Sequence, residues 1–572
     1  MCEICPYFSL FYSFTRTCFE LAMSTRPNDF RNKVQIWLPL IIAVSMVFGT
    51  LIGMRLPQSA AAVKISKSDA VRDYRLREGK IEELLRYIEA KYVDKVDRDK
   101  LVDEAIAKLM SQLDPHSSYI PASELEEVNE QLDGKFNGIG VEFLIVKDTA
   151  VVVSPMSGGP SEVAGILPGD KIIKVGDSVI VGEKLSNQRI VSFLRGEKGS
   201  KVQLSVLRPG SKKLHQYWIT RDQIPVKSVD AAYMISDRVG YIRVNRFTAQ
   251  TDKEFLESMR ILSEQGHMKD LVLDLRGNPG GYMQMATNML SQLFPNKGNL
   301  LVYTQGRASH RAEFNSNGRV FYPIDKVAVL IDEGSASASE IVAGAIQDND
   351  RGVIVGRRSF GKGLVQEQYQ LSDGSALRLT IARYFTPSGR SIQKAYDHGS
   401  EEYDRDVEER FKNGELLSAN KINIKDSTKY FTTKGRIVFG GGGIIPDVFV
   451  PLDTVQINDF FLEARQMIPA FVVKYLDKPK REQLSKMGLN AFQKKFNLNE
   501  QTFSEFKTYA VQNGLDGSTQ EWNTAQKEIA RFLKARIAKH LFDDKGFFTV
   551  MNHNDPTVQA ALKSLHSKDL SK

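Results

Sequence analysis

Short apolar runs alternate with segments of helical periodicity through the middle of the chain. Residues 327–331 (Val-Ala-Val-Leu-Ile) and 269–275 are two such runs, and continuous β-branched runs of this length are typical of buried strands. Each run ends at a turn rich in glycine or acidic residues. From residue 339 onward, apolar residues return at helical spacing. Alternating strands and helices predict an α/β core over residues 223–455.

Helical periodicity also marks both flanks of this core. We expect a helical N-terminal region over residues 69–130 and a C-terminal helical domain over residues 456–572. Oligomerisation is our first hypothesis for the C-terminal domain. The stretch 397–430 is charged and polar, which favours a surface insertion. The fold class is therefore a multidomain α/β protein with helical regions at both ends.

Residues 36–54 form the most apolar segment and contain no charged residue. Their length is close to what a helix needs to cross a bilayer core. Basic residues precede the segment, which favours residues 1–35 in the cytoplasm and the body on the other side of the membrane. We expect a transmembrane anchor. A cleaved signal peptide, with an A-x-A site at Ala60 to Ala62, is the alternative.

All three cysteines, Cys2, Cys5 and Cys18, lie within the first 22 residues. We hypothesise that Met23 is the true start and that residues 1–22 are not translated. In either case the body has no cysteine, which excludes disulfides and thiol catalysis there.

Composition narrows the class of function. A chain of 572 residues is too long for one core and predicts several domains. The net charge is +8 and 26% of residues are charged, but Lys and Arg are dispersed among Asp and Glu, so we expect no nucleic-acid binding. The eight histidines are scattered and no H-E-x-x-H helix is present, so we expect no metal and no cofactor.

The candidate chemistry lies in Gly334–Glu340 and in Lys362, which stands between two glycines. Ser337 falls at the expected strand-to-helix turn, near free amides of a helix N-terminus that can stabilise an oxyanion. A serine hydroxyl needs a base to become a nucleophile, and a lysine serves if burial lowers its pKa. Ser335 and Ser339 compete with Ser337, and composition alone does not choose among the three.

A second turn, residues 276–281 (Arg-Gly-Asn-Pro-Gly-Gly), follows the strand 269–275. Its backbone amides suit an anion. Phosphate binding and a plain turn are the alternatives, but neither a dinucleotide fingerprint nor a P-loop sequence is present.

These stretches, in this order, closely resemble the carboxyl-terminal processing peptidases, which are tail-specific serine proteases of family S41. The matching segments are residues 240–244, 274–281, 334–340, 355–363, 384–390 and 443–447. The resemblance implies that Ser337 is the nucleophile, Lys362 the general base and Gln366 the residue that orients the lysine. It also implies oxyanion donors from the amide of Ala338 and from Gly280 or Gly281.

Residues 131–222 resemble a PDZ domain. The stretch 138–143 (Gly-Ile-Gly-Val-Glu-Phe) matches a carboxylate-binding loop that runs into an edge strand. A peptide can add to such an edge while loop amides hold its terminal carboxylate, and we expect these amides to come from Gly138, Ile139, Gly140 and Val141. A degenerate module that only supports the core is the alternative.

The resulting hypothesis is a serine endopeptidase that cleaves near the C-terminus of exported proteins. By resemblance, its substrates have apolar C-termini. The charges around residues 36–54 favour a body in the periplasm of a bacterial cell envelope, and we expect a homo-oligomer. Two alternatives of other classes are a PDZ adaptor that binds tails without cutting and a membrane-tethered scaffold.

Overall fold

The structure is a computed structural model, and it describes residues 69–156, 158–182, 185–397, 399–424, 426–454, 458–476 and 478–567. Two compact units divide at Leu101. The first contains α3 (Asp69–Lys91), and α4 (Arg98–Met110) begins in it. Both lie where the periodicity predicts helices. No helix in the described ranges is long and apolar enough to span a membrane. The segments predicted at 1–35 and 36–54 lie outside the described residues.

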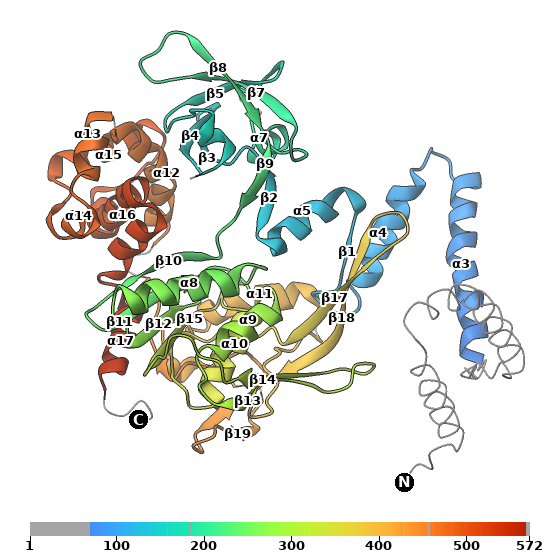
Figure 1. Cartoon of the computed structure of the whole chain (residues 1–572). Helices are drawn as coiled ribbons and strands as arrows, with labels where there is room; N and C mark the ends of the chain where they lie inside the picture. Colours follow the sequence, from blue (N-terminus) through green and yellow to red (C-terminus); the bar gives the residue numbers. More distant parts are fainter. Residues whose placement is uncertain are drawn as a thin grey trace, which may run out of the picture. The chain divides into compact units, whose positions relative to one another are not determined.

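A six-stranded sheet forms the centre of the second unit (Figure 1). Its order is β10 (Val229–Met234), β11 (Val239–Val244), β12 (Asp270–Asp274), β15 (Val327–Ile331), β16 (Val353–Gly356) and β21 (Val448–Phe449). All neighbours are parallel except the pair β10 and β11. The two runs predicted as buried strands are β12 and β15, and every residue of both is buried.

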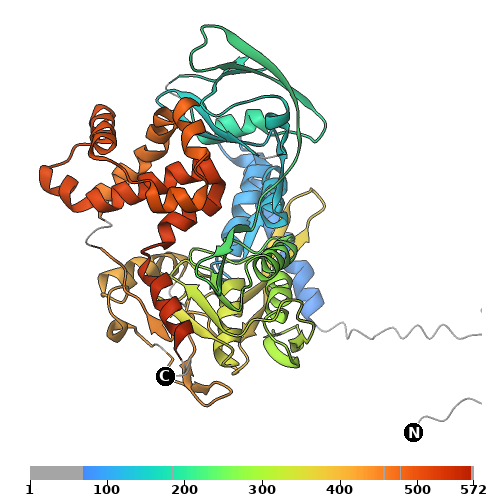
Figure 2. The same ribbon diagram turned by 60° about the vertical axis from the view of Figure 1, so that its left-hand side comes forward.

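Helices cover both faces of this sheet (Figures 1 and 2). Alternate residues of β12 and β15 pack on one side with α8 (Thr251–Glu264), α9 (Met283–Ser291) and α10 (Ala338–Asp348). The other residues pack against Val558, Ala561 and Leu565 of α17 (Pro556–His566). Because β12 and β15 are adjacent and parallel, their carboxyl ends bring two distant turns together at one edge.

A second sheet includes β17, which begins two residues after Lys362. Its strands are β1 (Ser118–Ile120), β13 (Lys297–Gln305), β14 (Ala312–Asn317), β17 (Leu364–Gln370) and β18 (Ala376–Phe385). Beyond it lie α11 (Ser400–Lys412), the 3₁₀ turn η1 (Ala419–Lys421) and the hairpin β19 (Lys429–Phe431) and β20 (Ile437–Phe439). The expected surface insertion at 397–430 is wrong in part, because Tyr403 and Arg410 of α11 are buried and Arg410 Nη1 donates to Ser359 O at 2.8 Å.

A small β-domain precedes the core. Helix α5 (Ala122–Asp133) leads to β2 (Lys135–Gly138), which pairs with β9 (Asp222–Pro225). Between them lies a sheet with the order β3 (Val141–Val146), β4 (Thr149–Pro155), β5 (Lys171–Val175), β7 (Lys201–Leu207) and β8 (Leu214–Thr220), with β6 (Ser178–Val179) paired to β5. Helices α6 (Pro160–Val163) and α7 (Asn187–Leu194) complete it.

The C-terminal helices share a separate core of aromatic and aliphatic side chains. They are α12 (Asp459–Tyr475), α13 (Lys478–Ser485), α14 (Leu489–Lys495), α15 (Glu500–Gln512) and α16 (Thr519–Asn552). The expected helical pattern is present, but α16 bends at Phe542 and Asp543, which have non-helical backbone angles. Past this bend the chain returns to the core sheet, where Tyr233 Oη donates to Phe548 O at 3.2 Å.

Candidate active site

The turn after β12 and the loop after β15 are fastened together. The Ala336 N–H donates to Asn278 O at 2.9 Å. The hydroxyls of Ser335 and Ser339 donate to Leu275 O at 2.9 Å and to Asn278 O at 3.0 Å. These hydrogen bonds join the glycine turn and the serine loop into one structural unit. From the sequence, their proximity was expected only through the family resemblance.

These contacts separate the three candidate serines. Ser335 and Ser339 are buried and their hydroxyls are committed to backbone carbonyls. The Ser337 hydroxyl donates to no acceptor in the described part of the chain, and the residue is half-buried at the N-cap of α10. Its φ is 54°, a left-handed value that non-glycine residues rarely adopt, as is common at functional sites. Ser337 is thus the serine whose hydroxyl is available.

Glu340 links the serine to the lysine. Its Oε2 accepts the N–H of Ser337 and the N–H of Lys362, both at 2.8 Å. Its Oε1 accepts the Gly361 N–H at 2.7 Å and the Ser359 hydroxyl at 2.6 Å. Burial raises the pKa of the Glu340 carboxyl to about 7, and the four donors oppose that rise. Sequence reasoning gave Glu340 no role, although a glutamate three residues after a helix-capping serine is a recognisable signal.

Tyr384 of β18 joins the same two residues from the other side. Its hydroxyl donates to Ser337 O at 3.0 Å and also contacts Lys362 O. The side chain is fully buried, and burial raises its pKa well above the usual value. One carboxylate and one phenol therefore hold the backbones of Ser337 and Lys362 together. Nothing in the sequence distinguishes Tyr384 beyond its place in one of the matching segments.

Lys362 has the environment that a neutral amine needs. Burial lowers its pKa and the charge of Arg378 lowers it further, while Glu340 and Asp114 act in the opposite sense. The ammonium makes no hydrogen bond or ion pair with any residue that the structure describes. The two flanking glycines allow close packing, since a Cβ at Gly361 would lie 3.2 Å from Gly443 N and one at Gly363 would lie 3.0 Å from Gln393 N.

Gln366 lies on β17, four residues after Lys362. Its Nε2 donates to Thr380 Oγ1 at 3.5 Å, and Thr380 Oγ1 donates to Asp114 Oδ1 at 3.1 Å. Gln366 and Lys362 are both described, and no hydrogen bond joins them. The structure therefore connects Gln366 to the network of Asp114 rather than directly to the amine.

His116 lies within the electrostatic reach of the lysine. Burial and the charge of Lys362 lower its pKa to about 4, and its Nε2 lies 2.8 Å from Tyr403 Oη. This neutral ring is part of the wall around the site, in keeping with a structural role.

Two of the predicted oxyanion donors lie beside Ser337: Ala338 follows it in the chain, and Gly280 packs against it. Within the described ranges, neither the Ala338 N–H nor the Gly281 N–H has an acceptor. The Gly280 N–H already donates to Asn278 Oδ1 at 2.8 Å. A Cβ at Gly280 would lie 2.8 Å from Ser337 Cβ and 3.0 Å from Ala338 N, so only glycine permits this approach. Of the three predicted donors, Ala338 and Gly281 are thus the two whose amides are free to bind an anion.

The predicted peptide loop leads into an end strand of the small sheet. Gly138 closes β2, and Val141 opens β3, which pairs with β4 alone. Among the described residues, nothing accepts the N–H of Ile139 or Gly140. The Ile139 carbonyl is fixed by Ser161, whose N–H and hydroxyl donate to it at 3.0 and 2.6 Å. The loop therefore offers two unpaired amides beside an end strand of the sheet. Helix α12 contacts this strand, and Lys539 Nζ lies 3.7 Å from Glu142 Oε1 on it.

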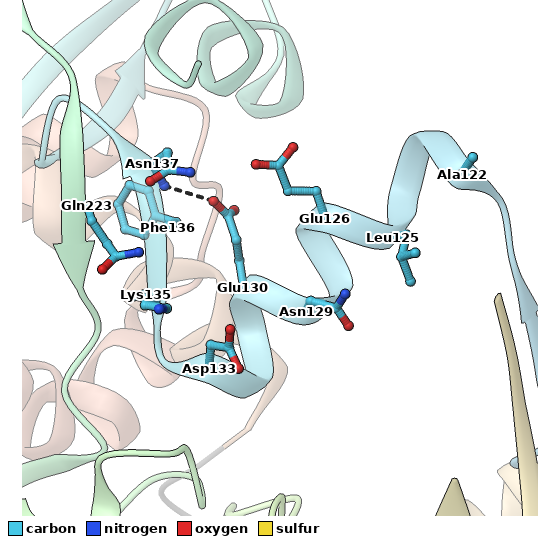
Figure 3. A pocket seen from close by; sticks show the side chains of 10 residues that line it. All are labelled: Ala122, Leu125, Glu126, Asn129, Glu130, Asp133, Lys135, Phe136, Asn137 and Gln223. Carbon is cyan, nitrogen blue, oxygen red and sulfur yellow. Dashed lines mark hydrogen bonds between the residues drawn. The ribbon is translucent and has the colours of Figure 1, made fainter. Parts of the chain in front are cut away.

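Two other features do not belong to this site. A pocket of about 480 Å³ lies between α5 and β2 (Figure 3), lined by Ala122, Leu125, Glu126, Asn129, Glu130, Asp133, Lys135, Phe136, Asn137 and Gln223. It contains none of the predicted catalytic residues. No group of three potential metal ligands occurs among the described residues.

Comparisons with known proteins cover most of this architecture. Residues 238–400 match the family model for peptidase family S41, and residues 137–216 match that for the PDZ domain. Residues 460–543 match DUF8443, a family of unknown function.

Several curated proteins are similar over much of their length. Carboxy-terminal processing protease CtpB of Bacillus subtilis is 35% identical over 369 residues, which cover 62% of this chain and 75% of CtpB. A carboxy-terminal-processing protease of Bartonella bacilliformis is 34% identical over 384 residues, which cover 66% of this chain and 86% of that protein. A solved photosystem II D1 C-terminal processing protease is 28% identical and covers 66% of this chain and 87% of its own, with a TM-score of 0.33.

A serine peptidase core joined to a PDZ domain that binds peptide C-termini defines the class of protein. The identity to the curated relatives narrows this class. The chain belongs to peptidase family S41, as a carboxy-terminal processing protease of the serine type.

Proposed function

We propose that Ser337 is the nucleophile and Lys362 the general base of this protease. The observation that carries the proposal is the shared attachment of both residues to Glu340 and Tyr384. It is supported by the uncommitted hydroxyl of Ser337 and by the lowered pKa of Lys362. An amine that is neutral at working pH can take a proton from an adjacent alcohol.

The reaction follows from these roles. Lys362 Nζ accepts the Ser337 Oγ proton as Oγ bonds to the carbonyl carbon of the scissile peptide. The amides of Ala338 and Gly281 hold the developing oxyanion, and each such donor contributes about 3 kcal/mol in comparable hydrolases. The ammonium then donates its proton to the leaving amine, and the C–N bond breaks. Water, deprotonated by the same amine, hydrolyses the ester on Ser337. Gln366 orients the lysine indirectly, through Thr380 and Asp114.

Substrate selection is assigned to the PDZ loop. The terminal carboxylate of a substrate binds the amides of Ile139 and Gly140, and the preceding residues add as a strand to β3. An apolar C-terminal tail is the substrate class, and exported proteins are its source. The body lies in the periplasm, held at the inner membrane by residues 36–54 or released there after signal cleavage. Sequencing the N-terminus of the mature protein from fractionated cells distinguishes these two forms.

A homo-oligomer is part of the proposal. Ile81, Leu84 and Tyr87 on α3 are 54%, 58% and 62% exposed and recur along one side of the helix. Exposed apolar stripes of this kind are typical of interfaces. Light scattering after size exclusion, on the wild type and on a triple serine variant at these positions, tests whether the stripe joins subunits.

The test of the catalytic proposal uses a folded reporter protein that ends in an apolar tail. Wild-type enzyme should shorten it near the C-terminus, as read by intact mass. Ser337→Ala should leave it uncut, whereas Ser335→Ala and Ser339→Ala, if folded, should retain cleavage. Cleavage by Ser337→Ala at the wild-type rate would refute the assignment.

A further inference from the structure

A buried ion network lies directly behind the glycine turn. Asp274, the last residue of β12, accepts Arg276 Nη2 at 2.7 Å, Arg276 Nε at 3.0 Å and the Tyr241 hydroxyl at 2.7 Å. Arg243 Nη1 lies 3.3 Å from the same carboxylate, and Arg243 Nη2 donates to Arg276 O at 2.9 Å. Arg243 Nε also lies 3.4 Å from Asp230 Oδ2, so Arg243 has a second carboxylate beside it. Arg276 needs a second carboxylate of its own, because the one charge of Asp274 is shared between two largely buried guanidinium groups.

The second negative charge beside Arg276 is the carboxylate of Asp555, which lies 279 positions later in the chain. Arg276 Nη1 donates to Asp555 Oδ1 at 3.1 Å and to Oδ2 at 2.9 Å. Asp555 precedes α17 as its N-cap, and its Oδ1 also accepts the Val558 N–H at 2.9 Å. The side chains of Arg276 and Asp555 are only 17% and 23% exposed. A contact this well shielded is stronger than a surface ion pair.

A short series of contacts connects Arg276 with Ser337. Arg276 is followed by Gly277, whose N–H donates to Asp332 Oδ1 at 2.8 Å. Asn278 then receives the Ala336 N–H, and Gly280 packs on Ser337. The position of the turn therefore depends on how Arg276 is held, and Asp274 alone occupies only its Nε and Nη2 atoms.

We propose that Asp555, in the C-terminal extension, is a positioning residue for the peptidase reaction. Its carboxylate fixes Arg276, and Arg276 fixes the 277–281 turn at the distance from Ser337 that the oxyanion needs. Asp555 touches no substrate atom. The inference rests on the proposed role of the turn as an oxyanion site, and it makes the start of α17 a support of the catalytic site.

The decisive variant is Asp555→Asn, which keeps the helix cap and the size of the side chain but removes the charge that faces Arg276. We expect kcat to fall about 10-fold with KM within about twofold of wild type, because the loss acts on the transition state. A peptide aldehyde that forms a tetrahedral adduct should lose about the same factor in affinity. Asp555→Glu should recover most of the loss in both measurements.

The chain offers a matched control at the other end of α17. Lys326 Nζ donates to Leu565 O and Ser567 O, both at 2.8 Å, so Lys326→Ala loosens the same helix without touching Arg276. We expect it to leave kcat within about twofold. Equal losses in Lys326→Ala and Asp555→Asn would overturn the proposal, since helix docking alone would then explain them.

Three further outcomes are decisive. Wild-type kcat in a folded Asp555→Asn overturns the inference, and so does a loss that appears only in KM. If Asp555→Asn fails to fold, Asp555→Glu is the variant that tests the inference. An Asp555→Glu protein of unchanged stability whose kcat is as low as that of Lys362→Ala also contradicts the inference. Ser337→Ala, run beside these variants, separates the two claims: an active Ser337→Ala sinks the proposed function, whereas an inactive one with a normal Asp555→Asn sinks only this inference.

Discussion

Replacing Glu340 with glutamine is the most informative single change in the site. The amide keeps the shape of the side chain but loses one of two acceptor oxygens. Its oxygen can stay on the N–H groups of Ser337 and Lys362, with its nitrogen toward Ser359, whose hydroxyl can turn to accept. The Gly361 N–H, which donates to Oε1 at 2.7 Å in the wild type, then faces an NH₂ group and has no acceptor.

The magnitude follows from these contacts. An orphaned buried N–H costs about 1–3 kcal/mol, and each hydrogen bond that loses a charged acceptor weakens by about 1 kcal/mol. Relief from burying a charge offsets part of this sum. We expect the free energy of unfolding to fall by about 2–3 kcal/mol. Because Ser337 and Lys362 lose their common support, we expect kcat to fall about 100-fold or more.

The assay pairs thermal unfolding with steady-state cleavage of a tailed reporter, below the unfolding temperature of the variant. Glu333→Gln is the matched control, because its carboxylate accepts Arg357 Nε at 2.8 Å and contacts neither Ser337 nor Lys362. It should retain wild-type kcat. A folded Glu340→Gln with kcat/KM within twofold of wild type would refute the role given to Glu340.

Three other predictions concern the same site. Lys362→Ala should keep the fold by circular dichroism and lose turnover, and near-normal cleavage would contradict a lysine base. Activity should fall on acidification, because protonation of Lys362 removes the base. Protonation of Glu340, whose pKa is about 7, removes a hydrogen-bond acceptor and lowers activity in the same direction. A flat kcat/KM profile from about pH 5 to 9 would contradict this prediction. Gly280→Ala should lower kcat about 100-fold, because its methyl group would lie 2.8 Å from Ser337 Cβ. Gly277→Ala is the control: Gly277 also has a positive φ, but a Cβ there meets nothing within 4 Å, so the variant should lose only about 1–2 kcal/mol of stability. Equal activity in the two variants would contradict the claim that the site requires the close approach of Gly280 to Ser337.

Local patterns predicted the elements that carry the site. The apolar run 327–331 is β15 with the same bounds, and the expected helix from residue 339 begins one residue earlier as α10. These predictions succeed because burial on both faces of a parallel sheet leaves a continuous apolar run, and because a helix that packs on a sheet needs an apolar side.

Contacts between distant residues could not be obtained in this way. Glu340 is the last residue of the serine run, but its partners at Gly361 and Lys362 come from another loop, and nothing local distinguishes it from an ordinary helix cap. The charged composition of residues 397–430 led to the wrong expectation of a surface insertion for the same reason. Arg410 lies in this stretch, yet it is 2% exposed because the carbonyls of Ser359 and Phe360 accept its N–H groups. The bond from Arg276 to Asp555 joins parts of the chain whose proximity only the fold creates.

The protonation state of Lys362 is the central claim, and it can be measured residue by residue. Competitive labelling of amines with acetic anhydride across a pH series, in Ser337→Ala so that the nucleophile does not react, gives the titration of each lysine by peptide mass mapping. We expect Lys362 to gain reactivity at a clearly lower pH than the exposed lysines of the same chain. A Lys362 that titrates together with those lysines would contradict a neutral amine base and the mechanism built on it.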